Sequence, residues 1–471
     1  MHLPELILYN SYLLMLNRRS FLTTAAACTA ASVSAAARKP NVILVYAHDL
    51  GYGDLGGYGG KIATPHLDRM AREGMRFTNF LSANPVCSPS RAALLTGRYP
   101  TRAGVPRVLF PRDKEGMPDR EQTIAQMLKP LGYKTMCVGK WHLGHLPPYL
   151  PTARGFDEYY GIPYSNDMSP RLLLHATPGK VDTVEQEATL ETLTPRYTEQ
   201  AVKFIEANKD APFFLYMPHT YPHIPLGASP RFKGKSPHGI YGDVVQELDW
   251  SVGEIMATLK KHKLEGDTLL LFSSDNGPWF LGSPGHLRGR KGTTYEGGVR
   301  EPFLARMPGR IPAGKVCPGV ASTMDILPTV AKLCGASPAN PIDGIDIWPL
   351  LSGQRPEIER EALLYFDNLY VQCVRRGKYK LHVARYNSAV YSPAPASGRV
   401  NLPLPAPELY DLSIDPDESY DIAPEHPEIV KDLQARMERL MAGFDEPIRK
   451  AHADTFAKQT TGSTAAHPRL K

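Results

Sequence analysis

Apolar segments with the length of buried β-strands alternate along this chain with helix-like segments, and this alternation constrains the fold more than any other feature. The strand-like segments span 41–46, 134–138, 213–217 and 268–272, and helix-like segments span 65–74, 120–131, 194–208 and 244–261. Continuous apolar runs of this length are typical of buried central strands. The alternation therefore predicts an α/β layered domain, with a large sheet between helices.

Each strand-like segment runs directly into acidic, basic or histidine side chains. In chain order these are His48-Asp49, Lys140 with His142, His219 with His223, and Asp275-Asn276. In open α/β sheets, ligands bind beyond the carboxyl ends of the strands. We therefore expect the four clusters to converge on one cleft.

A cysteine stands where a further helix is expected to begin, in Cys87-Ser88-Pro89-Ser90-Arg91. Pro89 suits the first helical turn and Gly97 suits the helix end. The free N–H groups at a helix N-terminus favour a thiolate or another anion, and Arg91 can bind two oxygens. Three residues between Cys and Arg are too few for a phosphatase-type cysteine loop. A buried structural cysteine is the remaining alternative.

The motif Cys-x-Pro-Ser-Arg, followed by Leu95-Thr96-Gly97-Arg98, resembles the signature of the type I sulfatases, in which this cysteine is converted to formylglycine. Other segments resemble the same family, and the arylsulfatase A-like enzymes within it, at 139–144, 161–167, 290–298, 377–380 and 409–412. The resemblance runs from about residue 41 to residue 428. It implies an alkaline-phosphatase-like α/β core with a large mixed sheet, and a smaller C-terminal antiparallel sheet packed against a helix.

A divalent metal is expected at Asp49, Asp275 and Asn276, together with the modified Cys87. Hard oxygen ligands suit Ca²⁺, or Mg²⁺, better than Zn²⁺. Turn capping is the alternative role for such Asp and Asn residues. The chain departs from the family pattern at His48, where the family has an aspartate. As a ligand, neutral His48 would weaken Ca²⁺ binding and favour a softer ion.

The resemblance also implies the roles of the remaining site residues. One hydroxyl of a hydrated aldehyde at position 87 would attack sulfur, and a second hydroxyl would lose its proton so that sulfate is expelled. The assisting groups have distinct tasks: Arg91 and Lys140 hold the modified residue, Lys291 binds sulfate oxygens, His223 protonates the leaving alcohol, and His142 accepts the second proton. His219 is expected to be structural.

The composition excludes some partners. The formal net charge of +6 is modest, and no basic stripe interleaved with aromatic residues occurs, so no nucleic-acid partner is expected. The family resemblance implies two partners, a sulfated small molecule or glycan and a maturation enzyme that generates formylglycine. It also predicts a sulfuric ester hydrolase, most readily one acting on a carbohydrate. Its alternatives are a phosphodiester or phosphonate hydrolase and an inactive glycan-binding homologue.

The first 37 residues resemble a twin-arginine export signal, with Arg18-Arg19 before an Ala-rich run. That run is shorter than the roughly 20 apolar residues of a membrane span. We expect a periplasmic or extracellular protein with no stable membrane span. A lipid anchor at Cys28 is less favoured, because no large aliphatic residue stands three positions before it.

Four segments are expected: the signal at 1–37, a catalytic sulfatase domain at 38–353, a C-terminal subdomain at 354–450 and a flexible tail at 451–471. The cysteines outside the motif are scattered and give no disulfide framework. Cys137 is expected in the core, and a bridge between Cys317 and Cys334 is left open.

Overall fold

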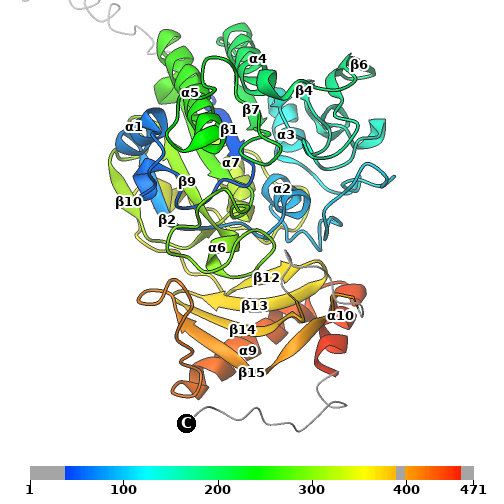
Figure 1. Ribbon diagram of the computed structural model, residues 1–471, viewed down its shortest axis with the longest axis vertical. Helices are drawn as coiled ribbons and strands as arrows, with labels where there is room; N and C mark the ends of the chain where they lie inside the picture. Colours follow the sequence, from blue (N-terminus) through cyan, green and yellow to red (C-terminus); the bar gives the residue numbers. More distant parts are fainter. Residues whose placement is uncertain (1–37, 389–397, 458–471) are drawn as a thin grey trace, which may run out of the picture. The chain divides into compact units, whose positions relative to one another are not determined.

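The computed structural model describes residues 38–388 and 398–457. Its larger sheet has eleven strands, in the order β10-β2-β9-β8-β1-β7-β3-β4-β5-β6, with β11 paired to β2 (Figure 1). The strands are β1 (Asn41–Ala47), β2 (Met75–Leu81), β3 (Lys134–Val138), β4 (Glu158–Gly161), β5 (Leu173–Thr177), β6 (Lys180–Glu185), β7 (Phe213–Pro218), β8 (Thr268–Ser274), β9 (Arg300–Arg306), β10 (Lys315–Cys317) and β11 (Ala321–Ser322). The central strands from β8 to β4 are parallel, whereas β9, β5 and β6 run antiparallel to their neighbours.

Helices cover both faces of this sheet. Helices α2 (Cys87–Thr96), α3 (Ile124–Leu128) and α7 (Ile326–Cys334) share one apolar cluster with Val42 and Leu44 of β1. Helices α1 (Pro65–Glu73), α4 (Leu193–Ala207) and α5 (Gly239–Lys261) share the other with Ile43 and Val45. Successive β1 side chains thus enter opposite cores, as expected for a strand buried on both faces.

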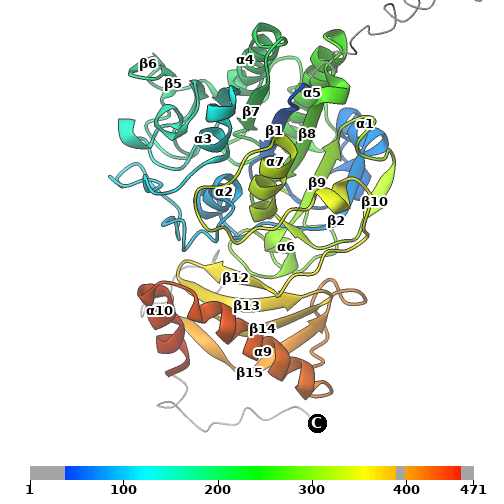
Figure 2. The same cartoon turned by 180° about the vertical axis from the view of Figure 1, so that it is seen from behind.

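A four-stranded antiparallel sheet follows, built from β12 (Leu363–Asp367), β13 (Tyr370–Arg376), β14 (Tyr379–Tyr386) and β15 (Asn401–Asp411). Its apolar cluster includes residues of α9 (Pro427–Ala442) and α10 (Glu446–Ala457), and Figure 2 shows both helices on one side of this sheet. Short helices α6 (Glu296–Val299) and α8 (Trp348–Leu351) precede this sheet in the chain. The sheet and the core form one compact unit.

The predicted fold class is confirmed: a large mixed sheet lies between helices, and a small antiparallel sheet with helices follows it. The four predicted central strands are β1, β3, β7 and β8. The helix expected at 120–131 begins only at Ile124, because the Thr123 side chain caps its first turn.

The C-terminal expectations concern a subdomain boundary and a tail. The expected boundary between residues 353 and 354 falls between α8 and β12 and stays a prediction. The expected tail is helical as far as Ala457, since α10 continues through residue 451 and buries His452 and Thr455. The rest of the tail, at 458–471, lies outside the described residues.

The export signal at 1–37, with Cys28, also lies outside the described residues. Among the residues that are described, no helix combines the length and apolar character needed to span a membrane. Cys137 is buried in the core, as expected. Cys317 and Cys334 are both free thiols, so the bridge left open between them is absent from this structure.

Candidate active site

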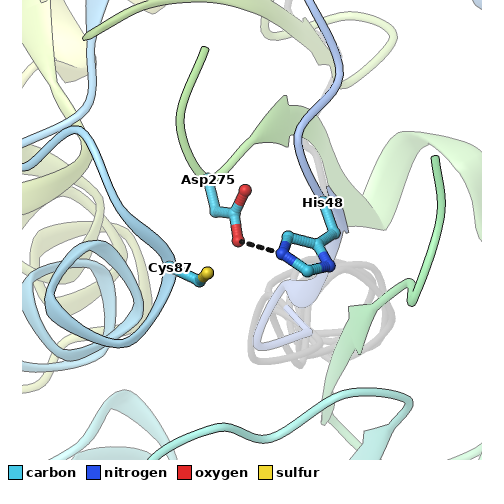
Figure 3. A group of neighbouring side chains, drawn as sticks. All are labelled: His48, Cys87 and Asp275. Carbon is cyan, nitrogen blue, oxygen red and sulfur yellow. Dashed lines mark ion pairs between the residues drawn. The ribbon is translucent and has the colours of Figure 1, made fainter. Parts of the chain in front are cut away.

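The predicted site residues come together at the carboxyl ends of the parallel strands. His48 and Asp49 follow β1, Lys140 and His142 follow β3, His223 follows β7, and Asp275-Asn276 follow β8. Figure 3 shows Cys87, at the start of α2, facing His48 and Asp275. The strand-end argument therefore correctly predicts which segments meet.

Cys87 is the first residue of α2 and is 3% exposed. No side chain caps this helix, whose N-cap position is Val86. The first-turn N–H groups and the positive end of the helix dipole therefore favour an anion at Cys87. At the other end, Gly97 closes the helix with a φ of 67°, in the left-handed region that glycine adopts readily.

Arg91 lies one helical turn beyond Cys87 and is fully buried. Its guanidinium donates to Asp275 Oδ2 from Nε at 3.1 Å and from Nη2 at 2.7 Å. Its Nη1 donates to the carbonyl of Lys140 at 2.9 Å. One arginine therefore connects α2 with the ends of two strands.

Asp49 is the second carboxylate of the site. Its Oδ1 accepts a hydrogen bond from Asn276 Nδ2 at 2.8 Å, and its Oδ2 accepts one from Lys291 Nζ at 2.7 Å. Asp49 has a φ of 61°, and its backbone N–H donates to Asp275 Oδ1 at 3.0 Å. The left-handed conformation is uncommon for a residue other than glycine and often marks a functional position.

His48 occupies the place where a first aspartate was expected. Its Nε2 lies 3.4 Å from Asp49 Oδ1 and 4.0 Å from Asp275 Oδ2. Its Nδ1 lies 3.2 Å from the carbonyl of Thr220, and Lys140 Nζ lies 2.7 Å from Nε2. These contacts fit an Nδ1–H that donates to Thr220 and an Nε2 that accepts from Lys140. Burial lowers the pKa of His48 well below its usual value, and nearby Lys140 acts in the same direction.

Three cations surround Cys87: Arg91, Lys140 and Lys291. Burial lowers the pKa of Lys140 to about 8, and Arg91 acts in the same direction. Burial also opposes protonation of Lys291, but Asp49, Cys87 and Asp275 together more than offset this, so its pKa is raised. Asp49 and Asp275 supply two negative charges against these three positive ones, which favours binding of an anion.

His142 is fully buried, and one ring nitrogen has a clear partner. Nε2 lies 2.8 Å from the carbonyl of Leu109, which can only accept, so Nε2 carries the proton. Nδ1 is buried and has no hydrogen-bond partner among the described residues. The lone pair of Nδ1 is therefore available, and burial keeps the pKa of this imidazole well below its usual value.

The backbone around His142 is not a regular strand. His142 has a φ of 62°, and Gly139 has a φ of 130°. Lys140 and His142 thus reach the site through a strained turn rather than through a regular strand.

His223 and Lys291 are the site residues with the most exposed side chains, at 9% and 14%. His223 Nε2 lies 3.6 Å from Asp49 Oδ2, and its ring stacks on that of His48 with 4.1 Å between centroids. Burial lowers the pKa of His223 well below its usual value, and Lys291 acts in the same direction. These two side chains therefore mark the open side of the site.

His219 has a different environment. Its ring nitrogen Nε2 lies 3.4 Å from Ser251 Oγ of α5, and its backbone N–H donates to Tyr46. Burial alone lowers its pKa to about 3. These contacts fit the structural role expected of His219.

The donor set fits a divalent cation. Asn276 Oδ1 is buried and has no hydrogen-bond partner among the described residues, and the carboxylates of Asp49 and Asp275 lie beside it. Ligand atoms of His48, Cys87 and Asp275 lie within 4.8 Å of one another, as do those of His48, Asp49 and His223. Oxygen donors suit Ca²⁺ or Mg²⁺, and the shared imidazole would suit a softer ion.

Sequence reasoning missed two backbone carbonyls that orient the histidines. Leu109 accepts from His142, and its N–H donates to Ser88 Oγ of α2 at 3.1 Å. The carbonyl of Thr220 lies against His48. No side-chain pattern could have identified either group, because both act through the main chain.

The fold and the site together define a protein suited to bind an oxyanion, with a cysteine at a helix N-terminus, buried cations and a metal-type donor set. Comparison with known proteins gives the family. Residues 40–336 match the family model described as Sulfatase, and residues 358–464 match the model described as C-terminal region of aryl-sulfatase. The chain belongs to the sulfatase family and is an arylsulfatase-like hydrolase.

Individual relatives and solved structures agree with this assignment. Arylsulfatase A of Homo sapiens is 40% identical over 461 residues, covering 88% of this chain and 90% of the relative. N-acetylgalactosamine-6-sulfatase of Canis lupus familiaris is 39% identical over 378 residues, covering 74% and 72%. The PsFucS1 sulfatase from Pseudoalteromonas sp. has a TM-score of 0.76 at 31% identity, covering 85% of this chain and 91% of that one. Ps i-CgsB in complex with k-i-k-neocarrahexaose has a TM-score of 0.72 at 31% identity, covering 86% and 93%.

Proposed function

We propose that this protein is an exported sulfatase that removes sulfate from a carbohydrate, with residue 87 as formylglycine. The observation that carries the proposal is the placement of Cys87 at an uncapped helix N-terminus among three cations, of which Arg91 and Lys140 are fully buried. Family membership implies the formylglycine, and its hydrate would supply the hydroxyl that attacks sulfur. A bound divalent cation would add positive charge for the sulfate oxygens, held by Asp49, Asp275 and Asn276, with His48 beside them.

The cations hold the sulfate group. Lys140 and Lys291 supply positive charge for its oxygens, and Arg91 fixes Asp275 and the start of α2. Such charge stabilisation in a buried site is typically worth about 3 kcal/mol for one donor. Because Arg91 and Lys140 are fully buried, water does not screen their charge.

Two histidines divide the proton transfers. His142 offers a free Nδ1 lone pair in the buried part of the site, so it accepts a proton near residue 87. His223 lies on the open side, where the alcohol departs, and donates a proton to that alcohol. An imidazole with a lowered pKa loses its proton readily. This role therefore requires that the bound sulfate raise the pKa of His223, so that the ring is protonated.

The carbohydrate part of the proposal draws on the relatives. One is an N-acetylgalactosamine-6-sulfatase, and the structure of Ps i-CgsB contains k-i-k-neocarrahexaose. Export draws on the twin-arginine pattern at Arg18-Arg19. A periplasmic or extracellular sulfatase would meet glycans outside the cell. Its maturation enzyme would be a partner before or during export.

The first test is a mass spectrum of the peptide that contains residue 87, from protein made in its own host. An aldehyde or its hydrate supports the formylglycine mechanism, and an unmodified thiol in active enzyme overturns it. The same preparation is then assayed on 4-nitrophenyl sulfate, on sulfated saccharides and on an aryl phosphodiester. Preference for the phosphodiester would overturn the sulfatase activity proposed, and saccharide binding without release would indicate an inactive homologue.

A matched variant separates the chemistry from the fold. Cys87→Ala removes the precursor of formylglycine with little change in buried volume, so we expect turnover to vanish and thermal stability to change little. Cys317→Ala serves as the control, since that thiol is also buried but lies at β10. Activity of Cys87→Ala near that of the wild type would refute the assignment of residue 87.

A further inference from the structure

A cavity of about 280 Å³ lies between the segment that carries Lys291 and the small sheet. One wall is formed by the segment 288–295, which leads into α6, and the other by β13 and β14. Its polar lining includes Arg288, Tyr295, Gln372, His382 and Arg385. The mechanism above uses none of these side chains.

The cavity adjoins the sulfate site through the main chain. Gly289 and Gly292 both line it, and Lys291 between them reaches Asp49. The backbone N–H of Gly292 donates to the carbonyl of Pro85 at 2.9 Å, two residues before Cys87. The segment 289–292 therefore borders the cavity and also contacts residues of the candidate active site.

Arg288 gives the cavity an uncompensated positive charge. Its guanidinium lies over the Tyr295 ring, 4.2 Å from the centroid, and Nη1 donates to the carbonyl of Glu418 at 2.7 Å. Among the described residues, no carboxylate forms an ion pair with it. A guanidinium stacked on a ring and tied only to a carbonyl keeps donors for an anionic ligand.

Two further cationic groups line the same space. Arg385 pairs with Glu408 through Nη2, but its Nε is buried and has no partner among the described residues. His382 Nε2 lies 2.6 Å from Glu418 Oε1, and His382 Nδ1 lies 3.0 Å from Cys373 Sγ. Burial opposes protonation of His382, but Cys373 and Glu418 prevail and raise its pKa to about 9, so the imidazole is charged at neutral pH.

The wall of the cavity is fixed before any ligand binds. Glu418 is buried, has a φ of 53°, and accepts from the backbone N–H of Glu296 at 2.6 Å. Lys380 donates to the carbonyl of Thr294 at 2.7 Å and to Glu296 at 3.0 Å. These contacts tie the segment before α6 to the small sheet, and such preorganisation lowers the cost of binding.

We propose that this cavity binds a second anionic group, carried by the unit of the saccharide next to the one that loses its sulfate. The inference rests on the proposed function and makes the substrate a polyanionic saccharide. The volume suits a single sugar unit, and the Tyr386 ring that lines it offers a face for such a ring. The second anionic group is a carboxylate or a sulfate.

Binding tests this inference without relying on turnover. The probes are three disaccharides with the same ester sulfate, whose neighbouring unit is neutral, carries a carboxylate or carries a second sulfate. Their affinities are measured by calorimetry on Cys87→Ala protein, with and without Arg288→Gln. We expect Arg288→Gln to weaken the binding of one or both of the doubly anionic probes by about 10- to 100-fold. The affinity for the probe with a neutral neighbouring unit should change far less.

The three probes identify the source of the second charge, because the probe that loses most affinity carries the preferred group. Arg376→Gln is the matched control: this arginine lies on β13, but its side chain is 45% exposed and does not line the cavity. Equal affinities with and without Arg288→Gln for both doubly anionic probes would overturn the inference. Sulfate release from 4-nitrophenyl sulfate by the wild type reports separately on the proposed function.

Discussion

Arg91 donates two hydrogen bonds to the same oxygen of Asp275, at 3.1 Å from Nε and 2.7 Å from Nη2. Both side chains are fully buried, and the other oxygen of Asp275 accepts from the backbone N–H of Asp49. This pair connects α2 to the metal-type donor set. The site is therefore built around a fully buried ion pair, in which water could not take the place of either partner.

Arg91→Met should destabilise the fold as well as stop turnover. The substitution leaves the Asp275 carboxylate buried without its cation, which typically costs about 3–5 kcal/mol. Urea unfolding of the two proteins measures the difference. Adding Asp275→Asn to Arg91→Met should restore part of the loss, because the uncompensated charge is then absent. A loss below about 1 kcal/mol would show that the pair is not held as described.

His48→Asp should tighten Ca²⁺ binding. The new carboxylate would stand beside Asp49 and Asp275 and replace a neutral imidazole, adding one negative charge to the donor set. Calorimetric titration of metal-free protein with Ca²⁺ measures the affinity. His48→Asn is the control for loss of the ring without gain of charge. Unchanged affinity in His48→Asp would contradict a ligand role at this position.

His142→Asn should lower kcat far more than it alters KM. Asparagine can keep a donor toward the Leu109 carbonyl, but it has no basic nitrogen in place of the free Nδ1. Loss of a positioned proton acceptor typically slows turnover by about 10²- to 10⁴-fold. Steady-state kinetics on 4-nitrophenyl sulfate measure both constants. A rise in KM with kcat unchanged would instead indicate a substrate-binding role.

The meeting of distant segments could be predicted from the sequence because the carboxyl ends of parallel strands lie at the same edge of a sheet. Asp49 and Asp275 follow strands that pair directly in the structure, β1 and β8. The end of α2 at Gly97 also followed from local conformational preference. Both inferences needed only periodicity and backbone chemistry, which a single chain displays.

Side-chain partners could not be predicted in the same way. Lys140 contacts His48, and His142 takes a positive φ two residues later; no residue type in that motif requires either. The charge of the cavity beside Lys291 depends on Arg288 and Glu418, which are far apart in the chain. Such pairings follow from tertiary packing alone.

His219 should make stability depend on acid pH. Its pKa is about 3 in the folded protein, against an ordinary value of 6.5, because burial disfavours the charged ring. Below pH 6.5 the unfolded chain binds a proton here and the folded chain does not, so stability falls as pH falls from about 6.5 toward 3. The contribution approaches about 1.4 kcal/mol per pH unit.

His219→Gln should therefore flatten the dependence of the unfolding free energy on pH between pH 6 and pH 4 by about that amount, measured by urea titrations at several pH values. His426→Gln, at a partly exposed position, is the control for loss of a histidine as such. Equal slopes for wild type and His219→Gln would mean that His219 gains a proton without unfolding.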